Sequence, residues 1–182
     1  MKAAYVLEAP AGELARLLAE GHPIDPASLA DADYQGTSLG LPAFVEKLTW
    51  KTFRKVFRRG RDGAVIGHNV RIDQRSGEPQ RDGRGSPITF GPYEVAPLPV
   101  GGTPFRCRAG VLLDYGAAHP RLHPLGLVRD PLVALDPGSA DLLLGATFLA
   151  LGPLHVRTPS YFLLERINTA AQERGRPRDP AR

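Results

Sequence analysis

The side chains best suited to chemistry gather between Asp114 and His123, a segment that also contains Tyr115 and His119. Two histidines four residues apart have a metal-ligand spacing when one helix face carries both rings. Pro120 stands between them and opposes a helix, so the spacing loses that meaning and we predict no metal site. In a loop these side chains can still converge on the mouth of a cavity. The alternative is a polar loop stiffened by prolines.

Two other polar residues, His68 and Arg129, lie within apolar stretches, where each needs a partner. Segment 64–73 alternates, and the face that holds His68 is predicted to point inward. That face comprises Ile66, His68, Val70 and Ile72. A histidine there is either a hydrogen-bonded core residue or a ligand contact or general base. Arg129 and its neighbour Asp130 either shape a β-bulge or orient a ligand's carboxylate through the guanidinium group.

Several familiar site signatures are absent from the sequence. The chain contains no G-x-S-x-G elbow, no Walker sequence and no clustered Cys/His pattern, which counts against the common hydrolase, nucleotide-binding and zinc-binding classes. No pattern predicts a cofactor. The single cysteine, Cys107, excludes an intramolecular disulfide and fits a reducing compartment, so we expect a cytoplasmic protein. The most apolar window, 142–151, is about half as long as a membrane-spanning helix, and we predict no transmembrane segment.

The composition indicates one folded domain built from short elements. The chain has 182 residues, of which 42% are hydrophobic and 23% charged, as in ordinary globular proteins. It contains 20 glycines and 18 prolines. Residues that interrupt secondary structure this often favour many short strands over a few long helices. We predict a single domain over residues 1–167, followed by a polar tail over residues 168–182.

The charge is moderately basic, with a formal net value of +4, and much of the excess lies in segment 51–61. Such a stretch can bind nucleic acid or an anionic membrane surface. Phe53 and Phe57, interleaved with Lys51 and Lys55, are suited to a stacking platform for bases. The alternative is a solvated face, so nucleic-acid or membrane binding is the least favoured of the three functions that the sequence suggests.

Apolar periodicity predicts one amphipathic helix over residues 13–20, acting as a lid or brace on a sheet, and a helical turn at 25–29. Strand candidates follow, separated by turn signals and without βαβ alternation. They span 34–40, 50–58, 64–73, 88–95, 106–115, 125–135, 142–151 and 160–167. This order predicts a mainly β protein, with an antiparallel barrel or sandwich.

Over residues 30–167 the order of features resembles the lipocalin-like bacterial proteins of largely unknown function that bear a G-x-W-x-G motif. The residues that carry the resemblance are Tyr34-Gln35-Gly36, Trp50 to Phe57, Asp114-Tyr115, Leu143-Leu144-Gly145 and Tyr161 to Arg166. Tyr34 stands at the place of the motif's tryptophan, and the family's Tyr-Asp order is reversed here. The resemblance implies a lipocalin-like antiparallel β-barrel with a short N-terminal helix and an interior that can hold an apolar ligand.

These observations favour a binding protein whose barrel cavity takes a hydrophobic or aromatic small molecule, covered by the N-terminal helix and loops. The candidate wall residues are Trp50, Tyr115 and Phe148, and the candidate polar anchors are His68 and Arg129.

The alternative function is an enzyme on the same barrel, an isomerase or cyclase. His68 or His119 would then act as general base, with Asp114 or Tyr115 assisting. Such chemistry needs only a shaped, dry cavity and one or two tuned groups, so it leaves little trace in a sequence. A histidine and a carboxylate that meet in one cavity would favour the enzyme.

Overall fold

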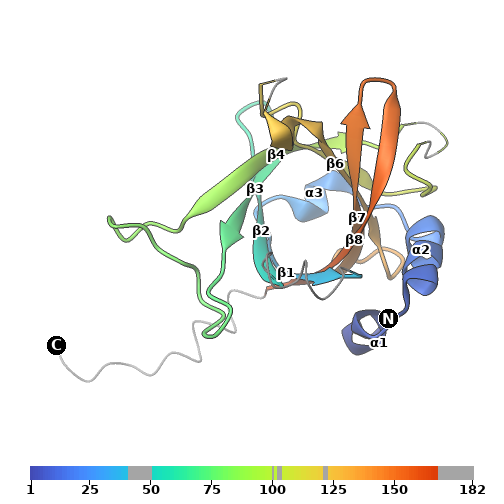
Figure 1. Cartoon of the computed structure of the whole chain (residues 1–182), viewed down its shortest axis with the longest axis horizontal. Helices are drawn as coiled ribbons and strands as arrows, with labels where there is room; N and C mark the ends of the chain where they lie inside the picture. Colours follow the sequence, from blue (N-terminus) through green and yellow to red (C-terminus); the bar gives the residue numbers. More distant parts are fainter. Residues whose placement is uncertain (41–50, 100, 102–103, 121–122, 168–182) are drawn as a thin grey trace.

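The computed structural model describes residues 1–40, 51–99, 101, 104–120 and 123–167, so Trp50 and the predicted tail 168–182 lie outside the described residues. Within the described part, eight antiparallel strands form a closed barrel in chain order, and the first strand pairs with both the second and the last (Figure 1). The prediction of a mainly β fold, a closed antiparallel barrel with a short N-terminal helix, is confirmed.

The strands follow the predicted segments, except that the fifth strand starts later and the eighth strand starts earlier than predicted. They are β1 (Asp33–Leu39), β2 (Thr52–Arg59), β3 (Val65–Arg71), β4 (Thr89–Pro97), β5 (Val111–Asp114), β6 (Val128–Ala134), β7 (Leu142–Leu151) and β8 (Leu154–Arg166). The strand predicted at 106–115 is wrong over its first half, because Arg106 and Gly110 have positive φ angles that interrupt an extended chain. β8 begins earlier than predicted and forms a long hairpin with β7.

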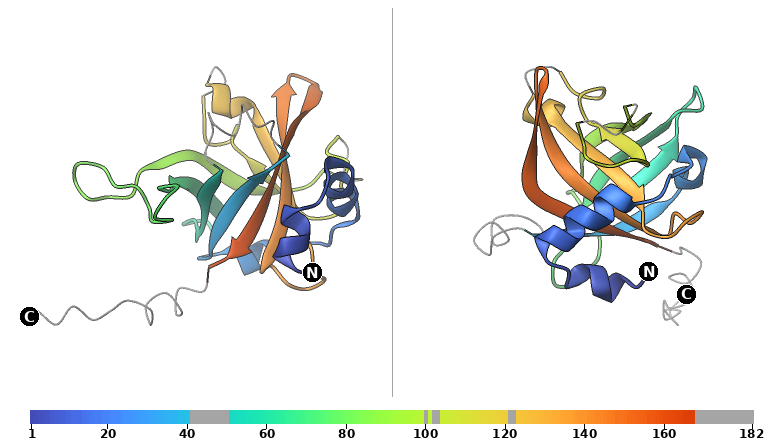
Figure 2. Two further views of the ribbon diagram at one scale, coloured as in Figure 1. Left: turned by 60° about the horizontal axis from the view of Figure 1, so that its bottom comes forward. Right: turned by 90° about the vertical axis from the view of Figure 1, so that its right-hand side faces the viewer.

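Three helices precede the barrel in the described chain: α1 (Ala3–Leu7), α2 (Ala11–Glu20) and α3 (Pro26–Leu29). α2 is the predicted amphipathic helix, and it lies across the outer wall formed by β7 and β8 (Figure 2). Its three leucines, at 14, 17 and 18, join a core with Val133 and Leu144 on the outer face of the sheet. The helix is therefore a brace, and the expectation that it covers the cavity is wrong.

α3 closes one end of the barrel. Its N-cap residue, Asp25, accepts a hydrogen bond from the backbone N–H of Ala27 through Oδ1, at 3.0 Å. The helical turn delivers Leu29, fully buried, to a core that contains Phe57 and Leu113 from inside the barrel. This apolar plug fills the barrel interior at the α3 end, and the interior cavity lies toward the other end.

The inner face of β3 differs from the prediction. Val65 belongs to the core inside the barrel, and Asn69 lines the interior cavity, so alternate residues between them face inward. Ile66 is 42% exposed on the outer face, and His68 shares that face. Val70 and Ile72 are buried there against Val56 in a small separate cluster. The apolar residues of the alternating pattern therefore lie on the outer face, where Val70 and Ile72 are buried in this cluster.

Three inward-pointing aromatic rings each lie over a glycine of the neighbouring strand. The pairs are Gly36 with Phe53, Gly67 with Tyr93, and Gly145 with Phe162. A Cβ built on Gly145 would stand 2.2 Å from the Phe162 ring, and one built on Gly36 would stand 2.3 Å from the Phe53 ring. The absent side chains therefore give the rings the space that they occupy, as in other sheets where an aromatic residue covers a glycine.

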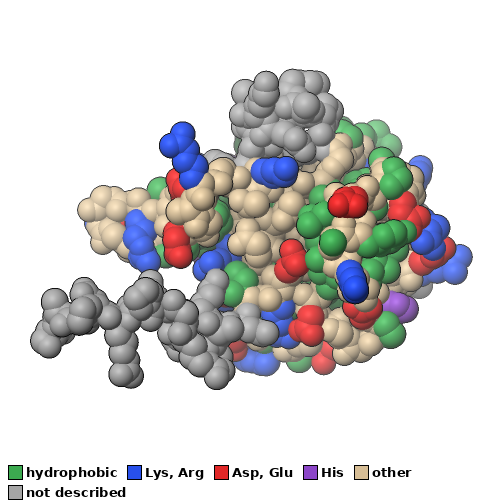
Figure 3. All heavy atoms as spheres, turned by 90° about the horizontal axis from the view of Figure 1, so that it is seen from below, with side chains coloured by type: hydrophobic (Ala, Val, Ile, Leu, Met, Phe, Trp, Pro, Cys, Tyr) green, Lys and Arg blue, Asp and Glu red, His purple; other side chains and the backbone are tan. Residues whose placement is uncertain are grey.

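Among the described residues, no helix has the length and hydropathy that a membrane crossing requires. A view from the side of α1 shows hydrophobic side chains gathered near that helix (Figure 3). Met1, Tyr5 and Leu7 contribute to its exposed apolar surface.

Candidate functional site

A cavity of about 220 Å³ occupies the barrel at the end opposite α3. It lies where β1 ends and β2 begins, and the 3-10 helix η2 (Pro124–Leu127) stands at its edge. Its walls are largely aromatic and aliphatic, with several polar groups among them. The lining residues are Ser38, Phe53, Lys55, Asn69, Phe90, Tyr115, Leu125, Val128, Asp130, Thr147, Ser160 and Phe162.

A second hollow, of about 410 Å³, lies near α3 and the turn at 137–140. It is larger, but its polar side chains, those of His22, Asp25, Ser28 and Ser139, are half-buried or exposed. The barrel cavity is the one into which buried polar groups converge, and it is therefore the candidate site.

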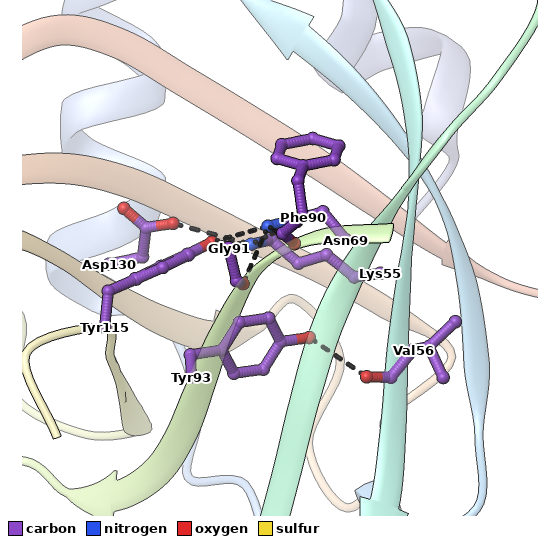
Figure 4. Close-up of polar contacts among 8 residues, drawn as sticks. All are labelled: Lys55, Val56, Asn69, Phe90, Gly91, Tyr93, Tyr115 and Asp130. Atoms are coloured by element: carbon purple, nitrogen blue, oxygen red, sulfur yellow. Dashed lines mark hydrogen bonds and ion pairs between the residues drawn. The ribbon is translucent and has the colours of Figure 1, made fainter. Parts of the chain in front are cut away.

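Lys55 is the centre of this polar group and is only 2% exposed (Figure 4). Its Nζ donates a hydrogen bond of 2.6 Å to the Tyr115 hydroxyl and one of 3.2 Å to Asn69 Oδ1. The carboxylate of Asp130 lies on the third side, with Oδ2 at 3.5 Å from Nζ. Asn69 is itself fixed, since its Nδ2 donates to the Gly91 carbonyl at 3.3 Å and to the Tyr115 hydroxyl at 3.2 Å.

Aromatic rings enclose the same ammonium group. Nζ of Lys55 lies 4.8 Å from the ring centre of Tyr93, 5.1 Å from that of Phe162, 5.2 Å from that of Tyr115 and 5.7 Å from that of Phe53. Cations are attracted to ring faces at such distances, and more strongly where water is excluded. The rings therefore stabilise the charge and also hold the amine in one place at the floor of the cavity.

Asp130 is 4% exposed, and its two oxygens have different surroundings. Oδ2 faces Lys55, whereas Oδ1 is buried without a hydrogen-bond partner among the described residues. A buried acceptor without a partner is costly, so Oδ1 is a position where a ligand's hydrogen-bond donor would be favoured.

Burial controls how these groups ionise. It lowers the pKa of Lys55 and raises the pKa of Asp130. In each case it outweighs the attraction between the two charges and, at Asp130, also the hydrogen bonds from Thr147, Lys55 and Tyr115. Burial, with the nearby Asp130 charge, also raises the pKa of the Tyr115 hydroxyl well above its usual value. Both members of the pair are thus displaced toward their neutral forms, which makes transfer of a proton between them easier than between the same groups in water.

No family model, curated protein or solved structure matches the chain. Function must therefore be inferred from the geometry of the cavity.

The structure places Tyr115 in the cavity, as the sequence suggested for a wall residue. Phe148 is buried elsewhere: its ring packs edge-on against Phe105, at 5.2 Å between centroids, in the core under α2. The expectation that Phe148 lines the cavity is wrong, because the alternation along β7 points Thr147 inward and both Ala146 and Phe148 outward. Trp50, the third candidate, lies outside the described residues.

Neither histidine proposed as a general base lines the cavity. His68 is on the outer face of β3, where burial, and then the charge of Arg58, lower the pKa of its ring. His119 stacks on His123, with 4.5 Å between ring centroids, in the loop before η2. Burial, followed by the charge of His123, lowers the pKa of His119. The predicted pairing of a cavity histidine with a carboxylate is therefore wrong.

Asp114 and Arg129 form a structural pair on the outside of the barrel. Asp114 Oδ1 accepts the backbone N–H of Gly116 at 2.7 Å and lies 3.2 Å from the Arg129 guanidinium. Arg129 also donates to the carbonyl of Gly126 at 2.9 Å. Both side chains fix the turn after β5, and neither lines the barrel cavity, where the sequence analysis expected a catalytic or ligand-anchoring group. Among the described residues, no group of three or more His, Cys, Asp or Glu side chains could hold a metal ion.

The proposed stacking platform on β2 is also wrong. Phe57 is fully buried in the inner core, and Lys55 and Phe53 point into the barrel. Lys51 and Arg59, at the two ends of β2, remain exposed, but the rings that would stack on bases point into the barrel.

Sequence reasoning missed Lys55, Asn69 and Asp130 as site residues. The signal for Lys55 was present: it shares a period-two face with Phe53 and Phe57, two large apolar residues that seldom face water. A lysine on a buried face requires an acidic partner elsewhere in the chain, and Asp130 in an apolar stretch was that partner.

Proposed function

We propose that this protein binds a small aromatic molecule of about one ring in the barrel cavity. The size argument is direct: a cavity of 150 Å³ lined by apolar side chains takes up benzene, and this one measures about 220 Å³. The rings of Phe53, Phe90 and Phe162 offer a wall on which an aromatic ligand can pack.

The observation that carries the proposal is the buried Oδ1 of Asp130 at the cavity wall, which has no hydrogen-bond partner in the described part of the chain. A ligand with a hydroxyl or amine group satisfies this oxygen, whereas a plain hydrocarbon leaves it unpaired. We therefore expect phenol-like compounds to bind more tightly than benzene-like ones, by about 1–3 kcal/mol, the cost of a buried polar group without a partner.

Isothermal titration calorimetry with phenol and toluene tests this preference. Native mass spectrometry of freshly purified protein complements it, because a mass lost on denaturation would identify a ligand taken from the cell. The blocking variant is Val128→Phe, which fills the cavity, and the matched control is Ile66→Phe on the outer face. Phenol binding that survives Val128→Phe, or an absence of binding in the unaltered protein, would contradict the proposal.

A second candidate function, an isomerase or cyclase, is favoured by the contact of Lys55 with Asp130 and Tyr115. The lysine–aspartate pair takes the place of the histidine that the sequence suggested, since it can accept and return a proton inside a dry cavity. Recovery of a bound ligand in altered form would support the enzyme, and recovery unchanged would support binding alone.

The resemblance to lipocalin-like bacterial proteins is likewise part of this proposal. It is supported by the closed barrel of eight strands and by a cavity at one end.

A further inference from the structure

We propose that Lys55 forms a covalent imine with an aromatic aldehyde or ketone held in the cavity. This inference rests on the proposed function, because the carbonyl compound must first occupy the same space as any other aromatic ligand. It goes further by naming the reacting atom, Nζ, and the chemical class of the ligand.

The placement of the amine carries the inference. Lys55 reaches the cavity from β2, and four aromatic rings and two hydrogen-bond acceptors hold its Nζ in place. A nucleophile fixed beside a bound reactant gains from proximity and orientation, since little further ordering is needed when they react. A buried, desolvated lysine is also the usual form of an amine that attacks carbonyl compounds.

Asp130 supplies the required proton acceptor and donor. Oδ2 faces Nζ at 3.5 Å and is placed to accept a proton from the ammonium group, which leaves a neutral amine and a neutral carboxyl. Oδ1 has no hydrogen-bond partner among the described residues. The neutral carboxyl group then donates the proton taken from Lys55 to the oxygen of a carbonyl ligand that lies against it in the cavity.

The reaction balances without any other reagent. The nitrogen lone pair attacks the carbonyl carbon, a C–N bond forms, and the carbonyl π electrons move to oxygen, which takes the proton from Asp130. The carboxylate of Asp130 then accepts a proton from the nitrogen and returns it to the hydroxyl, which leaves as water while the C=N bond forms. The products are one water molecule and a protonated imine beside the Asp130 carboxylate, in the place of the original ammonium.

Reductive trapping with benzaldehyde and sodium cyanoborohydride tests the proposal. Cyanoborohydride delivers hydride to the protonated imine and leaves a benzyl group on the amine. The chain has four lysines, so chymotryptic peptide mapping by mass spectrometry resolves the sites. They are Lys2, Lys47, Lys51 and Lys55. We expect Lys55 to be labelled at least about tenfold faster than the exposed Lys51, because only Lys55 has a held reactant beside it.

Two controls keep the outcomes separate. Lys55→Met removes the adduct, whereas the matched variant Lys51→Met leaves it unchanged. Benzyl alcohol, which has the ring but no carbonyl, competes in the unaltered protein, so this control does not depend on whether Lys55→Met folds. Benzyl alcohol binding measured by calorimetry, with Lys55 labelled no faster than Lys51, overturns the imine and leaves the proposed function intact. Absence of both binding and Lys55 labelling overturns the two together.

Discussion

The contact between Lys55 and Asp130 makes a quantitative prediction about stability. Both side chains are almost fully buried, and removing one partner of a buried ion pair costs about 3–5 kcal/mol because the remaining charge has no counterpart. Lys55 also has two neutral acceptors and can lose its proton, and Asp130 can gain one. We therefore expect the lower end of that range, about 3 kcal/mol, for either Lys55→Met or Asp130→Asn.

The double variant, Lys55→Met with Asp130→Asn, contains no buried charge at this position. Replacing a buried pair by neutral residues of similar volume is often nearly neutral relative to breaking it. We expect the double variant to cost no more than about 3 kcal/mol, the same as either single variant, which corresponds to a coupling energy of about 3 kcal/mol. Urea unfolding followed by circular dichroism, extrapolated to water, measures all four proteins.

Additive costs would refute the reasoning. If the double variant loses the sum of the two single losses, Lys55 and Asp130 do not stabilise one another, and the two side chains must be solvated independently. A change in the slope of free energy against urea would instead indicate that a variant had altered the unfolded or native state, so equal slopes are required for the comparison.

The pH dependence isolates the carboxyl group. Burial raises the pKa of Asp130, so between about pH 4, the ordinary value for aspartate, and its raised value the native state holds a proton that the unfolded state has lost. Stability must fall as the pH rises through that window. Comparing Lys55→Met with the double variant at several pH values measures this fall. A flat difference would mean that the Asp130 pKa is not raised.

Three further predictions concern the walls of the barrel. Tyr34→Phe should cost about 1–3 kcal/mol in urea unfolding, because the buried carbonyl of Ala140 loses the hydroxyl that donates to it at 2.7 Å. Gly145→Ala should cost about 1–3 kcal/mol and weaken phenol binding in calorimetry, because the new methyl group displaces the Phe162 ring toward the cavity. His68→Gln should leave phenol affinity unchanged, since this side chain is on the outer face; a large loss would contradict that placement.

The sequence was sufficient to predict the barrel because its strands are short, its turns are rich in glycine and proline, and no helices alternate with the strands. It was less informative about which face of a strand points inward. In β3 the inward positions include Gly67 and Asn69, a small and a polar residue, while Val70 and Ile72 are buried outside. A period-two pattern identifies a strand, but it cannot tell an inner core from an outer one when both exist.

The same limit explains why the site was missed. Lys55 and Asp130 lie on strands far apart in the chain, and only closure of the barrel brings them to 3.5 Å. Considered separately, the sequence pattern assigns Lys55 to a basic surface and Asp130 to a β-bulge. Tyr115 could be predicted because it directly follows β5 and continues the alternation of inward-pointing residues along that strand.

The buried pair itself argues for a function at the cavity. An ion pair in a barrel interior contributes little net stability compared with apolar residues of the same volume, because desolvation offsets the attraction. The end of this barrel that α3 closes is filled in that apolar way, with Leu29, Phe57 and Leu113. The polar group stands only at the hollow end, with a carboxylate oxygen left without a hydrogen-bond partner among the described residues. A fold that needed only stability would fill both ends alike, so the difference between them is best explained by a ligand.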